Sequence, residues 1–213
     1  MNHPSARVSE ILRRFEERDP HPKTELFYTN PYTLLVAVVL SAQATDASVN
    51  KVTPFLFAQC GTPEAMCVLG EEGLADAIKT IGLYKTKARH VIALSAILRD
   101  SYDGQVPMSR EALEALPGVG RKTANVVLSV AFGQPTIAVD THVFRVSHRL
   151  GLSRGKTPLD VEKDLEALIP ETRRANAHHW LILHGRYICV ARKPKCPSCF
   201  LEDLCPFPEK TLK

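Results

Sequence analysis

The sequence predicts an all-α protein, and two observations lead to this fold class. Apolar residues recur with helical spacing through most of the 213 residues, whereas the alternation typical of strands is nearly absent. Short turn sequences separate the helical stretches, namely GTPE at 61–64, DGQVP at 103–107 and GQP at 133–135. We expect helices at residues 7–18, 32–44, 46–57, 73–81, 85–102, 110–115, 119–132, 141–150, 158–168 and 172–189.

Three stretches carry further structural signals. The longest apolar run, LLVAVVL at 34–40, is too short to span a bilayer and is typical of a buried helix. Pro117 and Gly118 end the helix that contains SREALEA. The segment after Cys189 is rich in proline and cysteine, so we expect an irregular loop there.

Basic residues are concentrated in two stretches, although the formal net charge is only +4. From Ala115 to Leu159 there are six Lys or Arg and a single acid, and from Thr172 to Lys195 there are six more and no acid. Segregated basic stretches suit binding to a phosphate backbone. A solvated basic face would have the same composition, so charge alone leaves both interpretations open.

The first twenty residues are charged and lack the apolar core of a signal peptide. We therefore expect a cytoplasmic protein without membrane contact. In that reducing compartment, the six cysteines are expected to be metal ligands or free thiols rather than disulfides.

Four cysteines near the C-terminus follow the spacing Cys189-x6-Cys196-x2-Cys199-x5-Cys205. Four thiolates this close in sequence can converge on a tetrahedral zinc ion or on an iron–sulfur cluster. Zinc ribbons usually pair two C-x2-C knuckles, and only one such pair occurs here, which favours a [4Fe–4S] cluster that pins the loop. Four unrelated free thiols are the alternative. Cys60 and Cys67 are expected to be ordinary buried cysteines.

The sequence LPGVGRKTA at 116–124 predicts a tight turn between two helices. Gly120 lets the backbone turn sharply into the second helix, whose first N–H groups then form a cradle for phosphate. Plain helix packing is the competing interpretation. Lys122 lies in the first turn of that helix, where the macrodipole disfavours a cation. It is either a tolerated surface lysine or an amine that must act as a nucleophile.

Asp140 is the lone carboxylate of the first basic stretch and directly precedes a periodic apolar segment. An N-cap role explains it fully, because its oxygen can accept from the first N–H groups of the helix. A carboxylate fixed in this way is also available to a nearby lysine or to a developing cation, and the two roles are compatible.

These motifs together resemble the endonuclease III family, bifunctional DNA glycosylases and abasic-site (AP) lyases of the helix–hairpin–helix superfamily. The resemblance covers nearly the whole chain, through LSAQATD, IGLYKTKA, LPGVGRKTANVV, IAVDTH and HHWLILHGRYICVARKPKC. It implies two helical lobes with a DNA-binding cleft between them. One domain would comprise residues 24–133, and the other residues 1–23 with 134–213, including the cluster loop at 189–205.

The resemblance also implies roles for individual residues. Lys122 would be the nucleophile and Asp140 the essential carboxylate. A [4Fe–4S] cluster would be held by Cys189, Cys196, Cys199 and Cys205. Gln43 and Leu83 would enter the gap left by an extruded base, although local sequence alone makes them an ordinary polar residue and an ordinary aliphatic. Further DNA contacts would come from the hairpin, through Leu116, Gly118, Val119, Gly120 and Arg121.

The implied activity is removal of oxidised or saturated pyrimidines from duplex DNA through a lysine Schiff base, followed by β-elimination on the 3′ side of the abasic site. A monomer associated with the nucleoid is expected. The alternatives are a monofunctional mismatch glycosylase, whose members generally lack a lysine at the position of Lys122, and a non-catalytic DNA-binding protein with a cluster. A pure electron carrier would leave the hairpin unexplained.

Overall fold

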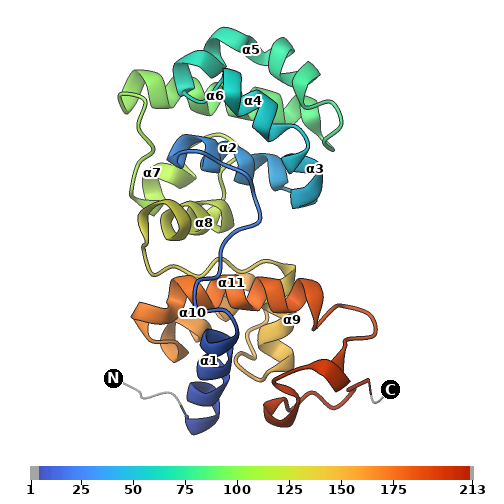
Figure 1. Cartoon of the computed structure of the whole chain (residues 1–213). Coiled ribbons are helices and arrows are strands. Elements are labelled where there is room, and N and C mark those ends of the chain that lie inside the picture. Colours follow the sequence, from blue (N-terminus) through green and yellow to red (C-terminus); the bar gives the residue numbers. More distant parts are fainter. Residues whose placement is uncertain (1–4, 212–213) are drawn as a thin grey trace. The chain divides into compact units, whose positions relative to one another are not determined.

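The structure is a computed structural model that describes residues 5–211. Within this range it contains eleven α-helices and two short 3₁₀ helices and no strand, so the all-α prediction is confirmed (Figure 1). The chain divides into two compact units. One spans Glu25–Gly133, and the other joins the residues up to Thr24 with those from Gln134 onward.

The unit Glu25–Gly133 is organised around a helix that is buried on all sides. This helix, α2 (Pro31–Ser41), starts at Asn30, whose side chain accepts from the Thr33 amide at 2.8 Å, and every residue from Tyr32 to Leu40 is buried. A helix without a polar face belongs in a protein interior. It lies between α6 and α8 (Figure 1) and contacts both. The remaining helices of the unit are α3 (Asp46–Asn50), α4 (Thr53–Gln59), α5 (Pro63–Ala77), α6 (Tyr84–Ser101), α7 (Arg110–Glu114) and α8 (Arg121–Phe132).

The second unit packs the N-terminal helix against helices from the far end of the chain. Phe15 stacks on Trp180 with ring centroids 5.8 Å apart, and the Trp180 indole N–H donates to the Asp19 carbonyl at 2.7 Å. The core that results holds α1 and the C-terminal helices together, and it also covers one side of the cysteine-rich loop. The elements are α1 (Ala6–Arg18), α9 (Thr141–Arg149), α10 (Pro158–Leu168), α11 (Glu171–Tyr187), and the 3₁₀ helices η1 (Cys196–Ser198) and η2 (Glu202–Leu204).

Three of the predicted helices differ from the observed ones. The helix predicted at 46–57 is two helices, because Pro54 has no N–H to continue the first helix and instead lies in the first turn of the second. The helix predicted at 73–81 ends at Ala77 and forms the second part of α5, which begins at Pro63 and is kinked at Gly70, where φ is 73° and the backbone is not helical. The Thr62 hydroxyl caps α5 by accepting from the Ala65 amide at 3.3 Å, so TPE is a helix start rather than a turn.

The third difference concerns α2, predicted to reach residue 44 but ending at Ser41. Gln43 has a φ of 55°, in the left-handed region, and cannot continue a right-handed helix. The other helices begin and end within two residues of their predicted bounds. Within residues 5–211, no helix is both long enough and apolar enough to cross a membrane.

Candidate active site and cluster loop

The hairpin between α7 and α8 is a tight turn built by a proline and a glycine. The Val119 amide donates to the Leu116 carbonyl at 3.1 Å, and Gly118 has a φ of 78°. Proline second and a left-handed glycine third are the residues that a type II turn requires. A Cβ atom at Gly118 would lie 2.9 Å from Nδ1 of His90, so the turn also needs the glycine for close packing against α6.

The hairpin presents its backbone rather than large side chains. Leu116 and Val119 are buried and anchor the turn, while Gly118 and Gly120 are exposed. Gly120 is the N-cap of α8 and offers no side-chain acceptor to the first amides of that helix. The start of α8 is therefore suited to accept an anion such as phosphate.

Lys122 lies one residue inside α8, directly beyond this turn. Its side chain is exposed, as is that of Arg121. Lys122 belongs to the unit Glu25–Gly133, whereas Asp140 belongs to the other unit. Each residue is therefore positioned by the core of its own unit.

Asp140 is the N-cap of α9, as its sequence context predicts. One carboxylate oxygen accepts from the amides of both His142 and Val143, each at 2.8 Å. The segment leading into it is held firmly, because Ile137 to Val139 are buried and the Ala138 carbonyl lies 3.0 Å from Nδ1 of His178. The carboxylate is therefore fixed in direction and half-buried, with its second oxygen left for other contacts.

Gln43 and Leu83 both lie at exposed turns in the left-handed region. Gln43 has a φ of 55°, and Leu83, the residue before α6, has a φ of 59° and a side chain that is 60% exposed. Among the described residues, only four non-glycine residues have positive φ. A leucine in this conformation is strained by roughly 1–2 kcal/mol, and an exposed apolar tip adds no core packing in return.

The four C-terminal cysteines line one pocket together with Arg149 and His184. Within residues 5–211, no three His, Cys, Asp or Glu side chains are arranged to hold a single metal ion. Burial raises the pKa of Cys199 to about 11 and also raises the pKa of Cys205. These thiols keep their protons at neutral pH unless a cation lies beside them, and the irons of a cluster would supply that positive charge.

Arginine side chains of α9 fix the first part of the loop. Arg149 donates to the Val190 carbonyl at 2.8 Å and to Sγ of Cys189 at 3.5 Å, and it lies 4.7 Å from the ring centroid of Phe207. Arg145 donates to the Cys189 carbonyl at 3.1 Å. Donors directed at a thiolate sulfur stabilise its negative charge, which is the second-sphere support that cluster ligands need.

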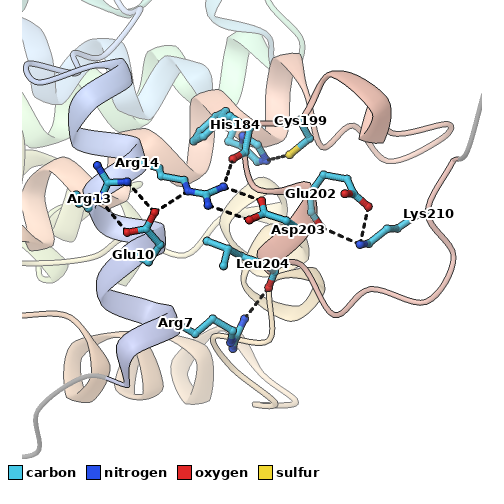
Figure 2. A network of polar contacts seen from close by, with 11 residues as sticks. Arg7, Glu10, Arg13, Arg14, His184, Cys199, Glu202, Asp203, Leu204 and Lys210 are labelled. Carbon is cyan, nitrogen blue, oxygen red and sulfur yellow. Dashed lines mark hydrogen bonds and ion pairs between the residues drawn. The ribbon is translucent and has the colours of Figure 1, made fainter.

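Arginines of α1 fix the last part of the loop (Figure 2). Arg14 donates to both carboxylate oxygens of Asp203, at 2.6 and 2.8 Å, and to the Phe200 carbonyl at 2.8 Å. Figure 2 also shows His184, whose Nε2 lies 3.6 Å from Sγ of Cys199. Burial lowers the pKa of His184 to about 4, so the ring beside the sulfur is neutral.

Sequence reasoning singled out the cysteines but missed Arg149, Arg14 and His184. Arg149 and Cys189 are 40 residues apart, and Arg14 and Asp203 are 189 residues apart. The one local signal is that Arg149 lies in the last turn of α9, where a cation suits the dipole. Of the two cysteines predicted to be ordinary and buried, Cys60 is buried and Cys67 is half-buried. Both lie in the other unit as free thiols, and desolvation raises the pKa of each.

Two family models match the chain. Residues 36–171 match the HhH-GPD superfamily of base excision DNA repair proteins, and residues 189–205 match the iron–sulfur binding domain of endonuclease III. The second match covers all four C-terminal cysteines, and the chain's cofactor is a [4Fe–4S] cluster.

Individual relatives match over nearly the full length. Endonuclease III of Escherichia coli K12 is 57% identical over 205 residues, which is 96% of this chain and 97% of that protein. The structure of a trapped endonuclease III–DNA covalent intermediate superposes with a TM-score of 0.87 at 51% identity, covering 93% of this chain and 95% of that chain. A thermostable thymine-DNA glycosylase has a TM-score of 0.82 at 29% identity, with 94% of each chain covered.

The hairpin, the capped aspartate and the cysteine loop thus occur in a chain that matches these proteins over nearly its full length. The chain belongs to the endonuclease III family of the HhH-GPD superfamily of base excision DNA repair proteins.

Proposed function

We propose that this chain is a base-excision-repair DNA glycosylase and DNA-(apurinic or apyrimidinic site) lyase that acts on oxidised or saturated pyrimidines in duplex DNA. The observation that carries this proposal is the 57% identity to Escherichia coli Endonuclease III over 97% of that protein. A lysine at position 122 supports the bifunctional reaction over a monofunctional one. The thermostable thymine-DNA glycosylase is only 29% identical to this chain, compared with 57% for Escherichia coli Endonuclease III.

Each compact unit carries residues that this function uses on damaged DNA, Lys122 and the hairpin in one and Asp140 in the other. The exposed backbone of Gly118 and Gly120 contacts phosphate, assisted by Arg121 and by the buried anchors Leu116 and Val119. Gln43 and Leu83 occupy the space that the extruded nucleotide leaves. We further infer a monomer that works in the cytoplasm on DNA of the nucleoid.

The reaction starts with extrusion of the damaged nucleotide, because the sugar C1′ is inaccessible inside a base stack. The neutral amine of Lys122 attacks C1′, and the base leaves with the electron pair of the glycosidic bond. Asp140 stabilises the positive charge that develops on the sugar ring. The adduct rearranges to a Schiff base, which acidifies the 2′ carbon. Loss of a 2′ proton then expels the 3′ phosphate and cleaves the strand.

Cys189, Cys196, Cys199 and Cys205, which line one pocket, would hold the cluster as its thiolate ligands. Bound there, the cluster supplies a fixed cross-link between the end of α11 and the loop that follows. The donors of Arg145 and Arg149 direct the first ligand, and Arg14 ties the loop to α1. This support explains how a segment with little core of its own keeps one conformation.

A monofunctional mismatch glycosylase and a non-catalytic DNA-binding protein are distinguished from this proposal by the products they leave. The first would release a base and leave an uncut abasic site, and the second would change neither base nor strand. The proposed enzyme cuts the strand and leaves an unsaturated aldehyde at the 3′ end of the cut.

The charge of Asp140 is tested by Asp140→Asn, because asparagine caps a helix as well as aspartate does and so preserves the start of α9. We expect base excision from a duplex with one oxidised pyrimidine to fall by about 10²-fold or more, the size of effect seen when one electrostatic stabiliser is removed. Single-turnover kinetics measure the rate, and thermal unfolding checks the fold.

The matched control is Asp160→Asn, which changes a carboxylate at the start of α10 that accepts from the Thr157 amide at 3.0 Å. It should excise at the wild-type rate. Wild-type activity in Asp140→Asn with a normal melting curve would remove Asp140 from the mechanism.

The hairpin is tested by comparing Gly118→Ala with Gly120→Ala. Gly118 has a φ of 78° and a Cβ there would meet His90, so we expect a loss of about 1–2 kcal/mol in unfolding free energy and weaker duplex binding. Gly120 has a φ of −99° and open space around a Cβ, so alanine fits there without strain. The gain from a less flexible unfolded chain is opposed by the poorer N-cap that alanine makes, so the unfolding free energy should change less than in Gly118→Ala. Equal stability of the two variants would contradict the turn geometry.

The cluster ligands are tested by Cys199→Ala against Cys60→Ala. Cys199 lines the cluster pocket, whereas Cys60 is a buried thiol of the other unit. We expect Cys199→Ala to lose most of its iron and its visible absorption, and Cys60→Ala to keep both. Iron and protein assays on freshly purified samples give the amount of iron per protein chain. A full iron content in Cys199→Ala would exclude Cys199 as a ligand.

A further inference from the structure

Lys87 is a buried cation in a part of the molecule that the proposed mechanism does not use. It lies in the first turn of α6, three residues after the helix begins, and is 5% exposed. Burial of an ammonium group is costly unless it is well compensated. Burial accordingly lowers the pKa of Lys87.

The side chain of Lys87 spans two helices. Its Nζ donates to the carbonyl oxygen of Leu40 at 2.9 Å. Leu40 lies in the last turn of α2, where carbonyl groups lack partners within the helix, and α2 has no basic residue of its own there. A cation from another helix therefore completes the end of α2.

The turn that follows Leu40 carries Gln43 at its tip. The Ala44 amide donates to the Ser41 carbonyl at 3.0 Å, and Ala42 has φ and ψ of −58° and 118°. With a φ of 55° at Gln43, this is type II turn geometry with glutamine at the position that favours glycine. The strained conformation persists only if its surroundings hold it.

The backbone of Lys87 also contacts the second tip. Its amide donates to the carbonyl oxygen of Leu83 at 3.0 Å, the regular first hydrogen bond of α6, and Leu83 is the left-handed residue that precedes this helix. The side chain of Lys87 therefore links the start of α6, four residues beyond Leu83, to the end of α2, three residues before Gln43.

We propose that Lys87 is a positioning residue for base extrusion, which sets the spacing of Gln43 and Leu83 so that both enter the DNA together. The inference rests on the proposed function, in which these two side chains fill the space vacated by the damaged nucleotide. The ammonium is the partner of the buried Leu40 carbonyl, and an apolar side chain would leave that carbonyl without it. The end of α2 would then be free to shift and to move Gln43 relative to Leu83.

The test compares two substrates for each enzyme. The first is a duplex with an oxidised pyrimidine opposite a purine, which requires extrusion and filling of the gap. The second is the same duplex with a preformed abasic site opposite an abasic spacer, which has no base to extrude and no partner base to stabilise. The ratio of the two single-turnover rates is independent of the fraction of folded enzyme.

We expect Lys87→Met to lower the first rate by tenfold or more, up to about 10²-fold, the effect of misplacing a group by roughly 1 Å. The second rate should change by less than about twofold, so that the ratio falls. Lys79→Met is the matched control, because Lys79 is a solvent-exposed lysine of the same unit paired with Asp76 at 3.0 Å. Its ratio should equal that of the wild type.

Lys87→Arg and a double variant extend the test. Arginine keeps a cationic donor for Leu40, so Lys87→Arg should recover part of the lost ratio even if Lys87→Met folds poorly. Gln43→Ala should lower the ratio of the two single-turnover rates in the wild-type background. It should lower that ratio less in the Lys87→Met background, because Lys87 acts by positioning Gln43.

An unchanged ratio in Lys87→Met, or effects of Lys87→Met and Gln43→Ala that are fully additive, would overturn the positioning role. A wild-type enzyme that fails to excise the oxidised pyrimidine would overturn the proposed function itself. The two failures are therefore separate results of one series of measurements.

Discussion

The amides at the start of each helix need acceptors, and the residue that meets this requirement at α9 is the carboxylate proposed to act in the reaction. Seven of the described helices begin at a Ser, Thr, Asn or Asp whose side chain accepts from a helix amide, including Asp140 of α9. In contrast, α4, α6, α8 and α11 begin at Val52, Leu83, Gly120 and Pro170 and have no such cap. Two of these uncapped starts, those of α6 and α8, carry residues proposed to contact DNA, and the capped start of α9 fixes a carboxylate.

The turns next to these helix starts contain residues in the left-handed region, and these residues differ in backbone strain. Gly118 is a left-handed residue because the hairpin needs one, and glycine adopts that conformation without strain. Gln43 and Leu83 adopt it at a cost, with side chains exposed. Backbone strain of this kind is typical of residues with a functional side chain, and it persists only when the surrounding structure holds the strained residue in place. The buried ammonium of Lys87 between α2 and α6 is part of that surrounding structure.

Local chemistry predicted much of the candidate site. The cap at Asp140, the turn at Gly118 and the spacing of four cysteines are all readable from neighbouring residues. The break before Pro54 and the helix start at Thr62 were misjudged, although both have local signals in proline and threonine. Contacts such as Arg149 with Cys189, or Lys87 with Leu40, join residues 40 or more positions apart, so no local pattern could reveal them.

The proposed reaction requires Lys122 to form a covalent bond to the sugar. Borohydride reduction during turnover, on duplex DNA with one oxidised pyrimidine, converts a Schiff base into a stable amine link. Proteolysis and mass spectrometry then locate the modified residue. We predict one modified peptide, with the adduct on Lys122, and no adduct in Lys122→Gln. An adduct on another amine, or an equal yield from Lys122→Gln, would contradict the assignment of the nucleophile.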